Sequence, residues 1–177
     1  MQAKATPSST LAEEAEHHGI APLIAPAIEA LSRKRPDLVD DAVHWTFVAL
    51  ASRHRAAAAA REQCIEALLE AFDTAGIRLV LLKGAVLAHR IYSPELRPML
   101  DIDVLIEPQH TERAIAIARS LGYTFASGYA SRFSGRLHHL PEATMDRAGF
   151  RMSLEIHLDA LSRDQHDYIS IDSICVV

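Results

Sequence analysis

Two aspartates interrupt a short apolar stretch, Leu100 to Ile106, near the middle of the chain. A β-strand places alternate side chains on one face, so Asp101 and Asp103 share one face and the apolar side chains between them share the other. Two carboxylates on one face of a strand repel each other unless a cation lies between them. A hard divalent cation, Mg²⁺ most readily, binds such a pair of oxygens. The stretch therefore predicts a strand that carries a metal site.

The composition indicates a globular protein without a basic field. The chain has 177 residues, of which 49% are hydrophobic, so it fits one domain or one domain with a helical extension. Its 18 basic and 23 acidic residues give a net charge of −5, which disfavours RNA as a partner. Cys64 and Cys175 lie far apart and form no CxxC motif, and no stretch resembles a signal peptide or a membrane span. These features predict a cytoplasmic protein with no membrane partner.

The chain is predicted to have three parts: a flexible tail (1–10), an N-terminal helical segment (11–75) and a catalytic core (76–177). Helices are expected from Ser9 or Thr10 to just before Gly19, over 22–32 and over 40–74, the last being one long helix or two joined near residues 53–55. The apolar stripe of these helices indicates packing. A face for a protein partner or a second copy of the chain remains open.

The core pattern alternates helices and strands. Strands are expected over 78–82, 101–106, 123–126, 137–144 and 151–158, with a turn at 146–149 before the last. Helices are expected over 85–92 and over 111–121, the second with Ala114, Ile117, Ala118 and Leu121 facing inward. This order predicts an α+β fold with a mixed α/β sheet and an N-terminal helical cap.

The last predicted strand supplies a third carboxylate. Ser153, Glu155 and His157 alternate with apolar residues, so Glu155 lies on the face away from the core. If this strand neighbours the strand with the two aspartates, three carboxylates converge. Such a set can hold the two divalent ions of a phosphoryl or nucleotidyl transfer site, about 3.5–4 Å apart.

The glycine turn before the aspartates supplies a candidate phosphate site. Gly84 permits close approach of a backbone, and the helix expected from Ala85 presents free amides at its positive end. Lys83 adds a full positive charge. Arg97 either clamps a phosphate or forms a salt bridge that orients an aspartate. His157 either contacts the nucleotide or a metal-bound water, or is an ordinary polar surface residue.

Taken together, the motifs resemble a known family. Lys-Gly ends one strand, Arg-Pro-Met-x-Asp-Ile-Asp-x-Leu-Ile follows the next helix, and Leu-Glu-Ile-His comes later. This order resembles the uncharacterised bacterial nucleotidyltransferase family of the polymerase-beta superfamily, over roughly residues 61–159. In the wider superfamily the turn is usually Gly-Ser, and the serine contacts the triphosphate. Here Ala85 follows Gly84, as in this subfamily.

The resemblance implies a polymerase-beta-like core, with an NTP, ATP among the candidates, as substrate and Mg²⁺ or Mn²⁺ as cofactor. By the same resemblance Asp101 and Asp103 bind the metal ions. Glu155 is the third carboxylate, which ligates the metal that activates the acceptor hydroxyl and can serve as base.

Three functions follow as hypotheses. The first is a Mg²⁺-dependent nucleotidyltransferase that moves an NMP from an NTP to an acceptor hydroxyl, with a small molecule or protein favoured over RNA as acceptor. The second is a catalytically silent nucleotide- or protein-binding module, an accessory of a biosynthetic or toxin-control cluster. The third is a metal-dependent phosphohydrolase, in which the same carboxylates activate water.

Overall fold

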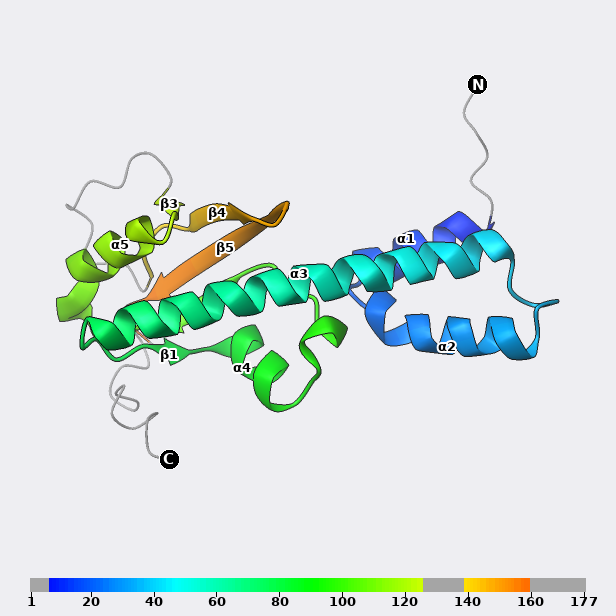
Figure 1. Ribbon diagram of the computed structural model, residues 1–177, viewed down its shortest axis with the longest axis horizontal. Coiled ribbons are helices and arrows are strands. Elements are labelled where there is room, and N and C mark those ends of the chain that lie inside the picture. Colours follow the sequence, from blue (N-terminus) through cyan, green and yellow to red (C-terminus); the bar gives the residue numbers. More distant parts are fainter. Residues whose placement is uncertain (1–6, 126–138, 160–177) are drawn as a thin grey trace, which may run out of the picture. The chain divides into compact units, whose positions relative to one another are not determined.

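A computed structural model of the chain describes residues 7–125 and 139–159 (Figure 1). The helices are α1 (Pro7–His17), α2 (Ala21–Lys34), α3 (Asp41–Thr74), α4 (Lys83–Arg90) and α5 (Thr111–Ser120), with two short 3-10 helices, η1 (Pro94–Leu96) and η2 (Pro108–His110). The strands are β1 (Val80–Leu81), β2 (Ile102–Leu105), β3 (Thr124–Phe125), β4 (Ala143–Arg147) and β5 (Phe150–His157). The mixed α+β class predicted from the sequence is confirmed. None of the helices in these ranges is both long and apolar enough to cross a membrane.

The chain divides into two compact units, Met1–Ala59 with Ala88–Pro98, and Ala60–Leu87 with Met99–Val177. Helix α3 contributes residues to both, and it is one continuous helix of 34 residues. Its first turn is capped by Asp40, whose carboxylate accepts a hydrogen bond from the Ala42 amide at 2.7 Å. The alanine run from Ala56 to Ala60 has high helix propensity, which suits an uninterrupted helix.

The first unit is helical in the residues that the structure describes. Small side chains of α1 and α2 pack against the start of α3 around the fully buried Phe47. Glu16 on α1 ties this packing together, because its carboxylate accepts hydrogen bonds from Arg53 (2.9 Å) and from the His54 ring (2.7 Å) on α3. These two helices are thus joined by both apolar and polar contacts.

The second unit is built on a five-stranded sheet with the order β1-β2-β5-β4-β3. Strand β2 pairs antiparallel with β1 and parallel with β5, and β4 pairs antiparallel with both β5 and β3. In Figure 1 the long β5 arrow lies beside β4, to which it is joined by a tight hairpin. The neighbouring placement of β2 and β5, which the sequence left conditional, is confirmed.

One face of this sheet forms the main core. The buried side chains of β2 and β5 on this face pack with the C-terminal half of α3 and with α5. The residues of this core include Leu68, Phe72, Ile102, Val104, Ala114, Leu154 and Ile156. Alternation along the strands then sends Asp103, Glu155 and His157 to the opposite face. The apolar core therefore fixes which way the polar side chains point.

Several predicted elements differ from the structure in their bounds. Helix α4 begins at Lys83 instead of Ala85 and ends at Arg90 instead of residue 92, since Pro94 disfavours helical backbone at the residue before it. In α5, Ile115 is buried while Ile117 and Leu121 are only partly buried, so the inward face is rotated from the predicted one. The first part of the strand expected over 137–144 and most of the tail expected over 1–10 lie outside the described residues.

Candidate active site

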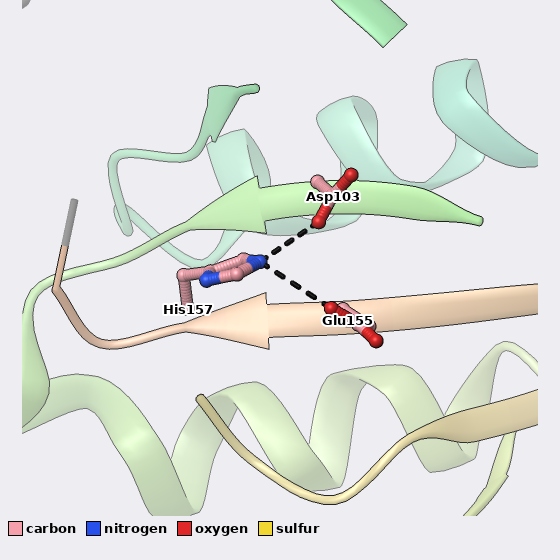
Figure 2. A group of neighbouring side chains, drawn as sticks. All are labelled: Asp103, Glu155 and His157. Atoms are coloured by element: carbon pink, nitrogen blue, oxygen red, sulfur yellow. Dashed lines mark hydrogen bonds and ion pairs between the residues drawn. The ribbon is translucent and has the colours of Figure 1, made fainter. Parts of the chain in front are cut away.

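The centre of the site is a register pair on two parallel strands. Asp103 on β2 lies opposite Glu155 on β5, and Leu105 lies opposite His157. Residues opposite each other in neighbouring strands point to the same face, and so do residues two apart along one strand. Asp103, Glu155 and His157 therefore converge, and Figure 2 shows the ring edge of His157 turned toward the two carboxylates.

The contacts within this group are short. His157 Nε2 lies 2.8 Å from Asp103 Oδ1 and 3.6 Å from Glu155 Oε2. One ligand atom from each of the three residues lies within 4.8 Å of the other two. The Asp103 side chain is 3% exposed, His157 12% and Glu155 29%, so the group has a buried end at Asp103 and an open end at Glu155.

Lys83 approaches Asp103 from the neighbouring strand. The Leu82 amide donates a hydrogen bond to the Asp103 carbonyl at 2.9 Å, which extends the β1–β2 ladder to the residue before Lys83. Lys83 Nζ lies 2.6 Å from Asp103 Oδ1, the same oxygen that contacts His157. The hydrogen bond to Asp103 raises the pKa of Lys83 against the opposing effect of burial, and the charges of Asp103, Glu155 and Asp101 raise it further.

The backbone at Lys83 is strained. Its φ is 45°, in the left-handed region that costs a residue with a side chain about 1–2 kcal/mol. Strain of this kind persists where the surrounding structure holds it, and it is concentrated at functional sites. Here it directs the lysine side chain to Asp103 while 58% of that side chain stays exposed to solvent.

The glycine turn is packed from within the same unit. A Cβ at Gly84 would lie 3.0 Å from the Met99 sulfur, so the absence of a side chain allows this close approach. The Ala85 amide donates to the Leu82 carbonyl at 3.2 Å, and Ala85 is fully buried. Lys83, Gly84 and Ala85 were expected to contact phosphate. Of these, Lys83 carries a charged side chain, which is 58% exposed.

Two other predicted residues are not members of the convergent group. Asp101 directly precedes β2 and is partly buried, and it is not a member of the group formed by Asp103, Glu155 and His157. Arg97 belongs to the first unit, where its guanidinium lies 5.5 Å from the centre of the Tyr92 ring. The Arg97 Nε is buried and has no hydrogen-bond partner in the part of the chain that the structure describes.

Sequence reasoning missed two features of the site. It did not find the ion pair that Lys83, assigned to phosphate, forms with Asp103, a residue 20 positions away. It also left His139 unassigned. His139 forms an isolated β-bridge with His157, and the centres of the two rings lie 5.6 Å apart. Neither contact has a local signal, because both depend on pairing between distant strands.

The three converging side chains fit a divalent cation. Carboxylates are ligands that Mg²⁺ and Mn²⁺ accept, and an imidazole is a ligand for transition-metal ions. The nearly buried Asp103 carboxylate contacts Lys83 Nζ and His157 Nε2. A divalent cation at this position would stabilise the Asp103 carboxylate by its positive charge, as Lys83 does in this structure.

Comparison with known proteins gives one finding about the family. A family model described as an uncharacterised nucleotidyltransferase matches residues 5–174 of the chain. Comparisons with curated proteins and with solved structures each gave no match. The family match spans nearly the whole chain and includes every residue of the site described above. The chain therefore belongs to a family of uncharacterised nucleotidyltransferases.

Proposed function

We propose that the protein transfers a nucleoside monophosphate from an NTP to an acceptor hydroxyl, in a reaction that depends on Mg²⁺ or Mn²⁺. The observation that carries this proposal is the register pair of Asp103 and Glu155, which brings two carboxylates from separate strands to one point on the sheet. Membership of a nucleotidyltransferase family supports the general reaction. The roles below are assigned from the contacts of each residue.

Asp103 and Glu155 would hold the cation, with Asp101 joining from the end of β2. Asp103 would be the fixed ligand, because its side chain is nearly buried, while the more exposed Glu155 is assigned to the acceptor side. A divalent cation supplies Lewis-acid stabilisation of the phosphate oxygens and favours ionisation of the acceptor hydroxyl. Glu155 is the candidate base for the proton of that hydroxyl.

In the transfer, the acceptor oxygen attacks the α-phosphorus of the NTP. The bond between the α-phosphorus and the bridging oxygen to the β-phosphate breaks, and pyrophosphate leaves with the electron pair. Lys83 would bind the departing phosphates, since its ammonium carries a full charge on a largely exposed side chain. Gly84 keeps the turn in place by its contact with Met99. Arg97 and His157 are further candidates for nucleotide contacts.

One observation also fits the catalytically silent binding module. Asp103 Oδ1 already contacts two protein groups, Lys83 Nζ and His157 Nε2, so this carboxylate has partners without a ligand. A module that binds nucleotide without turnover would keep these contacts. The experiment must therefore separate binding from transfer.

The first measurement is calorimetric titration of ATP, GTP, CTP and UTP, with and without Mg²⁺ or Mn²⁺, on wild type, Asp103→Asn and Asp101→Asn/Asp103→Asn. Asp146→Asn, an exposed aspartate on β4 of the same sheet, is the matched control. Metal-dependent binding of one nucleotide that is lost in the Asp103 variants but kept in the control supports the site. Absence of binding by every nucleotide would contradict the proposal.

The nucleotide that binds is then supplied with an α-phosphate label and candidate acceptors. Label recovered on a small molecule or a protein indicates transfer, and label recovered as free NMP without acceptor indicates the phosphohydrolase. Binding without either product supports the silent module. A partner or second copy bound through the N-terminal helices would appear as a larger mass in light scattering.

A further inference from the structure

We propose that His157 is a direct nitrogen ligand of the divalent cation, and that the site therefore selects Mn²⁺ over Mg²⁺ more strongly than an all-carboxylate site would. The inference rests on the proposed function in one respect: it assumes that a divalent cation binds at Asp103 and Glu155. It adds an imidazole to the ligand set expected from the sequence, in which only carboxylates bind the metal.

The geometry favours a shared cation. Ligand atoms about 2.1 Å from a six-coordinate ion lie about 3 Å from their neighbours in the coordination shell. His157 Nε2 lies 2.8 Å from Asp103 Oδ1 and 3.6 Å from Glu155 Oε2. The three ligand atoms lie within 4.8 Å of one another, and side-chain rearrangement would bring them to three vertices of one octahedron. Asp101 is not part of this group.

The alternative role for His157 is that of a hydrogen-bond donor that orients Asp103. Two observations favour the ligand. The same nitrogen faces both carboxylates, as a common cation would require, and Figure 2 shows it between them. Asp103 Oδ1 also has a second donor in Lys83 at 2.6 Å, so the carboxylate does not depend on His157 for its position.

An imidazole ligand changes the preference among metals. Mg²⁺ favours oxygen ligands and retains its water, whereas transition-metal ions bind imidazole nitrogen well. The His157 side chain is only 12% exposed, so its ring is held by its surroundings and binding would cost little further ordering. The ratio of Mg²⁺ to Mn²⁺ dissociation constants should therefore depend on this one side chain.

Pulsed electron paramagnetic resonance of Mn²⁺ bound to the full chain tests the ligand directly. We expect modulation from one directly bound ¹⁴N nucleus, which changes to the ¹⁵N pattern when the protein is labelled at histidine. The modulation should disappear in His157→Gln and remain in His139→Gln, the matched control on the neighbouring ring. Circular dichroism of each variant checks that the chain is folded.

Titration of the same proteins with Mn²⁺ and Mg²⁺ tests the selectivity. His157→Gln should lose at least about tenfold in Mn²⁺ affinity with a smaller loss for Mg²⁺. His157→Asp, which restores an oxygen ligand, should lower the Mn²⁺ preference while it keeps metal binding. Wild-type Mn²⁺ that is bound without nitrogen coupling overturns this inference and leaves the proposed function standing. Absence of Mn²⁺ binding to wild type overturns both.

Discussion

Asp103 and Glu155 are register partners in a parallel strand pair, 52 positions apart in the sequence and on one shared face of the sheet. The arrangement makes each carboxylate dependent on the other strand for its place. Asp103 lies at the buried end of the group and Glu155 at the open end. Substitution of the two residues should therefore have different effects on the stability of the fold. The predictions below follow from this difference and from the groups around it.

Glu155→Gln should weaken metal binding without unfolding the protein. The change removes one charge and keeps the side-chain shape, and 29% of the side chain is exposed, so the sheet has little reason to rearrange. We expect Mn²⁺ affinity to fall by at least about tenfold, with a melting temperature within a few degrees of wild type. Glu70→Gln, at an exposed position on α3, is the control that should leave both values unchanged. Equal Mn²⁺ affinity in wild type and Glu155→Gln would remove Glu155 from the ligand set.

Lys83→Met should have opposite effects on metal and nucleotide. The ammonium competes with a cation for Asp103 Oδ1, and a charge-assisted hydrogen bond contributes about 1.5–3 kcal/mol. Its removal should tighten metal binding by roughly tenfold and lower the melting temperature of the metal-free protein. Nucleotide affinity should fall, since the proposed phosphate contact is lost.

Differential scanning fluorimetry with and without Mn²⁺ measures the first effect, because a ligand that binds only the folded state raises the melting temperature. The metal-induced rise should be larger in Lys83→Met than in wild type. Lys34→Met, an exposed lysine at the end of α2, should behave as wild type. A smaller rise in Lys83→Met would mean that the lysine supports metal binding instead of competing with it.

Ala148→Asn should stabilise the β4–β5 hairpin. Arg147 pairs with Phe150, so the loop has two residues, Ala148 and Gly149, with φ of 51° and 80°. Positive φ at both positions is the type I′ turn, which favours Asn-Gly and disfavours alanine at the first position. We expect a gain of about 0.5–1 kcal/mol in urea unfolding with an unchanged slope. The same change at exposed Ala116 in α5 should instead cost about 0.5 kcal/mol.

The stability of the second unit should fall at alkaline pH. Burial raises the pKa of the Cys64 thiol above its ordinary value, and burial together with the nearby Cys64 raises that of Tyr123. In the unfolded chain these groups ionise near 9.0 and 10.0, so above these values the unfolded state binds fewer protons than the folded state. The stabilising contribution is therefore complete below pH 9 and is lost as pH rises.

Urea unfolding at about pH 8 and about pH 10 measures this loss. Cys64→Ala/Tyr123→Phe should lose less stability between the two conditions than wild type does. Tyr92→Phe, at a partly exposed tyrosine of the first unit, is the control and should follow wild type. An identical loss in the double variant would assign the alkaline sensitivity to other groups.

The strands that form the site could be predicted because their signals are local. Alternation of apolar and polar residues defined β2 and β5, and it also gave the face on which Asp103 and Glu155 lie. The strand ends and the start of α4 were displaced by a few residues, because hydrogen bonding and the strained backbone at Lys83 decide them. The α+β class followed from the order of the elements alone.

The partners of the site residues could not be predicted in the same way. The contact of Lys83 with Asp103 depends on the antiparallel register of β1 and β2, and the contact of His157 depends on the parallel register of β2 and β5. Local periodicity contains no information about register between separate strands. The close approach of Met99 to Gly84 likewise requires the folded chain, where a glycine expected to serve a ligand meets a partly buried side chain.

The parallel pairing of β2 with β5 has a consequence for the order in which the protein assembles. The β4–β5 hairpin closes through a two-residue turn and can form early, whereas the pairing of β2 with β5 joins segments far apart in the chain. During synthesis Asp103 is made 54 residues before His157, and only its ion pair with Lys83 is available to it in that interval. Lys83 is therefore the partner that Asp103, the proposed metal ligand, can pair with before β5 completes the site.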